Sequence, residues 1–136
     1  IQNEINKLGD YMSVPNHLLY TKDHEWIEFR DEYAIVGITD YAQSQLGDVI
    51  FVEFPEIGEH LHSGSSFGEV EAVKTVADLF APISGKVLSV NENIEDAPDL
   101  VNSDPYEKGW LIKISPSKHE EKDDLMNFKE YKSFIS

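Results

Sequence analysis

The sequence predicts a mostly β protein, a sandwich or barrel of short antiparallel strands followed by a helical C-terminal tail. Short segments rich in β-branched and aromatic residues are separated by glycine and proline turns. Helical patterns are few, and the clearest of them follow residue 117. The chain has 136 residues and shows no fixed-period repeat or linker, which favours a single domain.

The strands are expected in several separate segments. Residues 25–30 alternate polar and apolar side chains, with Ile27 and Phe29 on one face, and a polar break at Asp31 and Glu32 leads into a second strand at 33–38. This pair is predicted to form a hairpin. Further strands are predicted at 48–55, ended by its proline, at 85–91 and at 109–115, the last two each entered at a glycine.

Helical signals are short. Thr39 or Asp40 opens one or two turns that Gly47 ends, and residues 97–102 suggest another turn. Two helices are predicted at the C-terminus, about 118–125 and 128–135. Capping boxes mark their starts, formed by Ser117 with Glu120 and by Asn127 with Glu130. Apolar residues recur there at helical spacing: Leu125, Phe128, Tyr131 and Ile135.

Residues 67–80 are too long for one strand of a small domain, because strands usually have about 3–10 residues. We therefore expect this segment to fold back near its middle, at Lys74, although no turn residue marks the bend. Gly64 and Gly85 lie at similar distances on either side. Lys74 is also the only basic residue between Asp31 and Gly85, a stretch that holds ten acidic ones.

The formal net charge of −15 excludes some classes of function. Such a surface repels nucleic acid and anionic membranes, and it favours basic partners. The chain has no cysteine, which removes a disulfide framework and a cysteine nucleophile. No apolar run approaches the roughly 18 residues that span a bilayer. No residue set predicts a catalytic centre, and we assign no metal site.

Two interpretations of Lys74 follow. A lysine at a hairpin end is most often simply solvated, with weak pairing to Glu71 or Asp78. The alternative is a modification site, because an enzyme that acylates a lysine needs the amine at a protruding tip and recognition features beside it. Glu69, Glu71 and Asp78 would supply those features. A cofactor joined there would act as a carrier arm.

Longer segments resemble the glycine cleavage system H protein, a lipoyl carrier family. The resemblance covers "GEVEAVKTVADLFAPISGKV", "YTKDHEW", "VGITDYAQSQLGDVIFVEFPEIG", "LVNSDPYEKGWLIKI" and "EYKSF", in the family order. It implies a domain at 19–136, behind an N-terminal extension at 1–18. The implied fold is a barrel-sandwich hybrid, lipoyl-domain-like, with the lysine at a hairpin tip. Biotinyl domains and the lipoyl domains of 2-oxo acid dehydrogenases are only distant alternatives, since their cores around the lysine differ.

The resemblance implies that Lys74 carries lipoic acid through an amide and that the chain itself is no enzyme. The implied partners are glycine decarboxylase (P protein), which loads an aminomethyl group, aminomethyltransferase (T protein), and dihydrolipoyl dehydrogenase (L protein), which reoxidises the dithiol. A lipoate ligase or a lipoyl/octanoyl transferase would attach the cofactor. The resemblance also suggests that Glu25 belongs to the cleft that shelters the loaded arm. The alternative is that Glu25 is an ordinary glutamate on the surface of a strand.

Other functions stay open at this point. The same residues suit a lipoyl donor in a relay to other lipoyl-dependent dehydrogenases, and an unmodified acidic β-barrel interaction module is a further possibility. We expect a monomer. The chain starts without Met and carries an extension, which favours the mitochondrial matrix, with the bacterial cytoplasm as the alternative.

Overall fold

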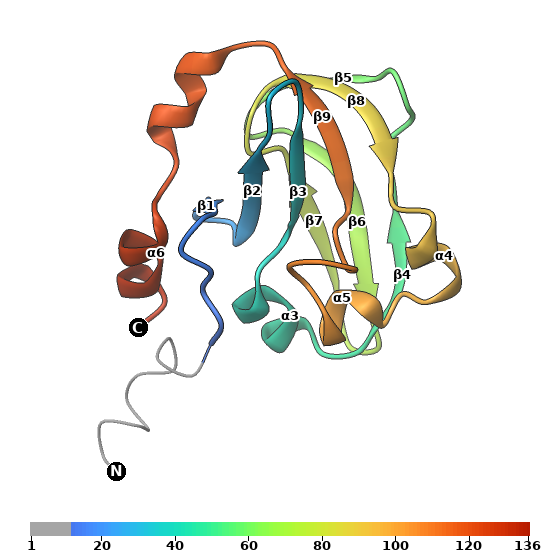
Figure 1. Cartoon of the computed structure of the whole chain (residues 1–136). Helices are drawn as coiled ribbons and strands as arrows, with labels where there is room; N and C mark the ends of the chain where they lie inside the picture. The colour runs from blue at the N-terminus through green and yellow to red at the C-terminus, as the bar shows by residue number, and fades with distance from the viewer. Residues whose placement is uncertain (1–11) are drawn as a thin grey trace.

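The computed structural model describes residues 12–136, which form two antiparallel sheets facing each other (Figure 1). The six-stranded sheet has the order β1–β2–β3–β9–β8–β5, and the three-stranded sheet has the order β4–β6–β7. The strands are β1 Leu19–Tyr20, β2 Glu25–Phe29, β3 Ala34–Ile38, β4 Val49–Glu53, β5 His60–Leu61, β6 Ser66–Ala72, β7 Val76–Phe80, β8 Gly85–Val90 and β9 Ile112–Pro116.

Short helices close the ends of this body and cover one side of it. They are α3 Asp40–Leu46, α4 Asn93–Asp96, α5 Leu100–Ser103, the 3₁₀ helix η1 His119–Asp124 and α6 Phe128–Phe134. None of the described helices is long and apolar enough to cross a bilayer. The segment 1–11 lies outside the described residues, so most of the expected N-terminal extension at 1–18 is not described.

Most of the predicted elements are confirmed. The hairpin of β2 and β3 has the register Ile27↔Val36, and Thr39 caps α3 by accepting a hydrogen bond from the Ala42 amide. The segment 67–80 does fold back, as β6 and β7. The capping box of Asn127 and Glu130 starts α6. The prediction of a mostly β, barrel-sandwich fold is therefore correct.

Several details of the prediction are wrong. The last strand begins at Ile112 rather than at 109, because the Gly109 amide still donates to the Asp104 carbonyl in the preceding turn. The region 118–125 is the 3₁₀ helix η1, whose N-cap Lys118 makes no side-chain cap, so the Ser117 capping box does not form. Glu121 instead binds the amide and hydroxyl of Ser84, at 2.6 and 2.8 Å, and this anchors η1 to the barrel. The sequence also did not predict β1, β5 and α4.

Two apolar clusters hold the fold. The larger fills the space between the two sheets and includes Ile27, Val70 and Leu79. The smaller lies on the outer face of the six-stranded sheet, where α6 packs over β1 and β2, and it includes Trp26 and Tyr131. Strand β2 serves both, because successive side chains point to opposite faces. Glu25 has the same parity as Ile27 and therefore points to the interior side.

Candidate functional site

Lys74 lies at the tip of the β6–β7 hairpin, at the lower end of the molecule in Figure 1, the end that also holds α3 and α5. The Ala72 amide donates to the Thr75 carbonyl at 2.8 Å, so Val73 and Lys74 are the two central residues of the turn. Neither has a positive φ, since His24 is the only non-glycine residue in 12–136 that does. The turn therefore needs no glycine or asparagine, which explains why the sequence did not mark it.

Hydrogen bonds hold the backbone of the hairpin tip in place, whereas its side chains are exposed to solvent. The Val73 amide donates to the Asp48 carbonyl at 3.0 Å, which ties the turn to the segment before β4, and Ala72 is buried. Lys74 and Thr75 are exposed. No residue in the described range forms a hydrogen bond or ion pair with the Lys74 side chain, so the expected weak pairing with Glu71 or Asp78 is absent. The amine is therefore open to an incoming enzyme.

Carboxylates form a row across the outer face of the three-stranded sheet. Glu69 lies directly opposite Asp78 on one side and Glu53 on the other, and all three are exposed. Like charges directly opposite each other in a sheet are destabilising. Glu71 lies one step nearer the tip, between Phe51 and Val76. The structure thus brings together the three acidic residues predicted for recognition, and it adds Glu53.

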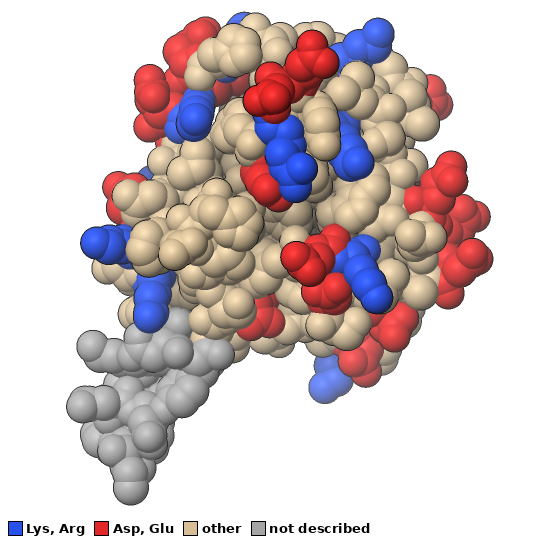
Figure 2. All heavy atoms as spheres, in the orientation of Figure 1, with Lys and Arg blue, Asp and Glu red and all other residues tan. Residues whose placement is uncertain are grey.

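An exposed apolar group lies beside this row at the tip. Phe51 is 56%, Val73 66% and Val76 55% exposed, and Ile50 is exposed at the bulge in β4. Apolar side chains with an acidic border are typical of a protein-binding surface. Acidic side chains are abundant elsewhere too: Figure 2 shows them gathered at the right edge of the view, on the side where β4 and α4 lie.

A cleft of about 340 Å³ opens next to β7. Strand β7 supplies Ala77, Asp78 and Leu79 to its lining, at three to five residues from Lys74, or roughly 10–17 Å along an extended strand. Apolar side chains line most of the cleft, and its charged or polar side chains include three carboxylates, those of Asp23, Glu25 and Asp78, together with His24, Gln45 and Tyr41. Asp78 also belongs to the carboxylate row. The volume is at the lower end of the range of small-molecule sites. A slender apolar chain with a polar head fits this lining.

Glu25 is the buried charge of this cleft. It is only 2% exposed, which excludes the alternative of a surface strand glutamate. Its carboxylate accepts hydrogen bonds from the Thr21 hydroxyl at 2.6 Å and from the Phe80 amide at 3.2 Å, so it joins β2 of one sheet to β7 of the other. Burial raises the pKa of Glu25 to about 7, even though these hydrogen bonds lower it.

His24, beside Glu25, has φ of 70° in the left-handed region. Its ring lies among aromatic side chains, with centroids 4.8 Å from Tyr41 and 5.8 Å from Phe134. Burial lowers the pKa of His24, so the ring is neutral near pH 7. An L residue adopts this backbone conformation only when its surroundings hold it there.

Sequence reasoning missed some residues of this region. Tyr41 and Leu46 were seen only as part of a short helix, yet they form one wall of the cleft. Glu53 was part of a predicted strand, and its place in the carboxylate row depends on the register with β6. The burial of Glu25 did have a signal, the alternation that gave it the same face as Ile27.

Comparison with known proteins gives a consistent result. A family profile described as glycine cleavage H-protein matches residues 18–136. The chain is 52% identical over 124 residues to the glycine cleavage system H protein of Oceanobacillus iheyensis, covering 91% of this chain and 98% of the other. It is 48% identical to that of Staphylococcus haemolyticus, with the same coverage. A crystal structure of a glycine cleavage system H protein from Mycobacterium marinum superposes with a TM-score of 0.80 at 40% identity, over 88% of this chain and 97% of the other.

We predict that Glu25 makes the stability of the chain fall as pH rises. Its pKa is 4.5 for an ordinary glutamate and about 7 when folded, so between these values the folded state binds the proton that the unfolded state has released. The free energy of unfolding should therefore fall by about 2–3 kcal/mol between pH 4.5 and pH 7 through this group alone. Glu25→Gln should remove that part of the slope, measured by denaturant unfolding at a series of pH values.

Glu28→Gln, on the same strand but facing outward, serves as the control and should keep the wild-type slope. Parallel stability curves for wild type and Glu25→Gln would contradict the prediction.

Proposed function

The chain belongs to the glycine cleavage H-protein family, the lipoyl carriers of the glycine cleavage system, and from this we propose that Lys74 is the residue that carries lipoate. One observation supports the assignment above all others. Lys74 is an exposed lysine with no partner among residues 12–136, at the tip of a two-residue turn whose backbone is anchored to the segment before β4. A modifying enzyme can therefore take this amine into its active site without deforming the barrel.

The surroundings of Lys74 also suit the modified side chain. Acylation removes the ammonium charge, and the finished arm is mostly hydrocarbon. The apolar side chains at the tip and the apolar lining of the cleft along β7 match such an arm. Lipoate, when attached, supplies two sulfurs that cycle between disulfide and dithiol, and one of them carries the aminomethyl group. A chain without cysteine has no such chemistry of its own.

The role that we propose for the cleft is protection of the loaded arm from water. An aminomethyl group is cationic, and three carboxylates line the cleft, those of Asp23, Glu25 and Asp78. A cation beside Glu25 would favour the ionised carboxylate and so lower its pKa from about 7. Glu25 would then hold the cargo, while Ala77 and Leu79 exclude solvent.

We further propose the partners and the setting of this carrier, which is itself no enzyme. The P, T and L proteins of the glycine cleavage system would dock on it transiently, and the net charge of −15 favours basic rims on them. Glu69, Glu71 and Asp78, with Glu53, would guide the lipoate ligase or lipoyl/octanoyl transferase to Lys74. The named relatives are bacterial, which supports the bacterial cytoplasm and gives no support to the mitochondrial matrix.

Replacing Lys74 tests the assignment directly. Lys74→Arg should abolish lipoate attachment because the guanidinium is not acylated in its place, and the intact mass of protein made in lipoate-replete cells should lack the lipoyl increment. Thermal stability should stay unchanged, because the wild-type ammonium has no partner in the described residues. Lys86→Arg, in β8, is the control and should keep the increment. If the Lys74→Arg protein still shows the lipoyl increment in its mass, the cofactor is attached to another residue and the assignment is wrong.

Neutralising the carboxylate row should separate stability from recognition. Glu69→Gln and Asp78→Asn each relieve a like-charge pair, so each should stabilise the fold by about 0.2–1 kcal/mol. Each should also slow lipoate attachment about tenfold in kcat/KM, through loss of complementarity with the modifying enzyme. Initial rates of attachment to the unmodified protein measure this.

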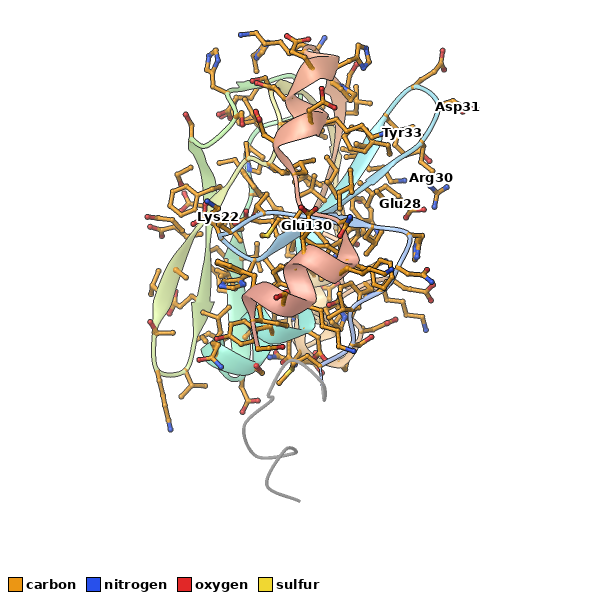
Figure 3. All side chains as sticks on the ribbon, turned by 90° about the vertical axis from the view of Figure 1, so that its left-hand side faces the viewer. Lys22, Glu28, Arg30, Asp31, Tyr33 and Glu130 are labelled. Carbon is orange, nitrogen blue, oxygen red and sulfur yellow. The ribbon has the colours of Figure 1, made fainter. Side chains whose placement is uncertain are left out.

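Asp31→Asn is the matched control, because Asp31 lies in the β2–β3 hairpin, far from the β6–β7 turn (Figure 3). If all three variants accept lipoate at the same rate, the carboxylate row takes no part in recognition by the modifying enzyme.

The carboxylate of Glu25 should slow loss of the carried aminomethyl group. In Glu25→Gln the side chain keeps its shape, and its one oxygen can accept from the Phe80 amide while its NH2 group donates to the Thr21 hydroxyl, but it no longer attracts a cation. We expect formaldehyde release from the loaded protein to be about tenfold faster, consistent with the loss of a buried charge pair. Glu28→Gln should behave like wild type. An unchanged release rate in Glu25→Gln would exclude this role.

A further inference from the structure

The hydroxyl of Tyr131 contacts a residue of one wall of the cleft and the N-cap of the helix that forms the other wall. Tyr131 belongs to α6, and its ring is completely buried. Its oxygen lies 2.8 Å from Nδ1 of His24 and 2.7 Å from the Thr39 hydroxyl. His24 lines one wall beside Glu25, whereas Thr39 caps α3, the helix that supplies Tyr41, Ala42 and Leu46 to the other wall. One atom on the C-terminal helix thus contacts both sides.

The two residues that the Tyr131 hydroxyl contacts, His24 and Thr39, each determine the position of one wall of the cleft. The Thr39 hydroxyl also accepts a hydrogen bond from the Ala42 amide at 3.1 Å, so it determines where α3 begins. His24 has its φ in the left-handed region and leads directly into Glu25. A hydrogen bond to its ring therefore restrains the residue that presents the Glu25 carboxylate. The Thr39 amide also donates to the His24 carbonyl at 3.0 Å. His24, Thr39 and Tyr131 therefore form one hydrogen-bonded junction, in which the Tyr131 hydroxyl supplies the side-chain contacts.

The ring and the hydroxyl of Tyr131 have separate surroundings. The ring stacks on Tyr20, with centroids 4.5 Å apart and planes 9° apart, and this contact belongs to the apolar cluster under α6. A phenylalanine would keep it. Tyr20 is equally buried, but its hydroxyl donates to the Pro15 carbonyl rather than to any residue of the cleft. The two stacked tyrosines therefore differ in whether their hydroxyl reaches the cleft.

We propose that Tyr131 is a positioning residue of the arm cleft, whose hydroxyl fixes the two walls relative to each other and so keeps the cleft closed around the loaded arm. This inference rests on the proposed function of the cleft. It also gives a role to α6, the helix that carries Glu130 in Figure 3, because this helix supplies the hydroxyl that contacts His24 and Thr39.

The first test needs no cofactor and compares unmodified Tyr131→Phe with Tyr20→Phe. Imidazole ¹⁵N shifts of His24 should change in Tyr131→Phe and stay at wild-type values in Tyr20→Phe. Hydrogen exchange at the Ala42 amide should be about fivefold faster in Tyr131→Phe only, because its acceptor is held less firmly. If both variants behave alike, the effect is one of general stability and the proposal is wrong.

The second test uses the lipoylated, aminomethyl-loaded protein. Formaldehyde release should be about fivefold faster in Tyr131→Phe than in wild type, and unchanged in Tyr20→Phe. Release in wild type is compared with release in urea, where no cleft exists. If wild type is no slower than the unfolded chain, the proposed protective function of the cleft fails. If wild type is protected and Tyr131→Phe is equally protected, only the role of Tyr131 fails.

Thr39 provides an independent approach to the same junction. Thr39→Ser keeps the hydroxyl and should give wild-type His24 shifts and wild-type release. Thr39→Val removes the hydroxyl and should reproduce the changes of Tyr131→Phe at His24 and in release. A wild-type His24 signal in Thr39→Val would contradict the proposed link between the two walls.

Discussion

The geometry of the cleft depends on one buried carboxylate that joins the two sheets. Glu25 begins β2 of the six-stranded sheet, and its oxygen accepts a hydrogen bond from the Phe80 amide at the end of β7 in the other sheet. A carboxylate in such an apolar place is held partly protonated at neutral pH, as its pKa of about 7 indicates. An apolar residue there would pack without this penalty. The chain keeps instead a group whose charge responds to whatever enters the cleft.

The hairpin tip and the cleft are two ends of one strand. Strand β7 begins after the turn that exposes Lys74, passes the cleft with Ala77 and Leu79, and ends at the Glu25 hydrogen bond. In the proposed function, the tip must be accessible to several enzymes, whereas the cleft must be closed to water. A short β strand satisfies both demands, because its backbone is rigid and its length sets the distance between them.

Much of this was predictable from the sequence, and the exceptions have physical causes. The strands of the barrel followed from alternation, and the position of Lys74 followed from the length of residues 67–80. The Lys74 turn had no sequence signal because it uses ordinary backbone angles. Glu121 replaced the predicted cap of η1 through a contact with Ser84, 37 residues away. The carboxylate row and the Tyr131 junction likewise depend on contacts between distant segments, which no local pattern contains.

The carboxylate row has one more consequence, for self-association. Strands β4 and β7 are the two edges of the three-stranded sheet, and each edge carries one member of the row, Glu53 on β4 and Asp78 on β7. An open edge invites strand addition from a second copy, and charged side chains on it oppose that pairing. The groups that weaken the sheet by mutual repulsion therefore also oppose edge-to-edge pairing of two copies of the chain.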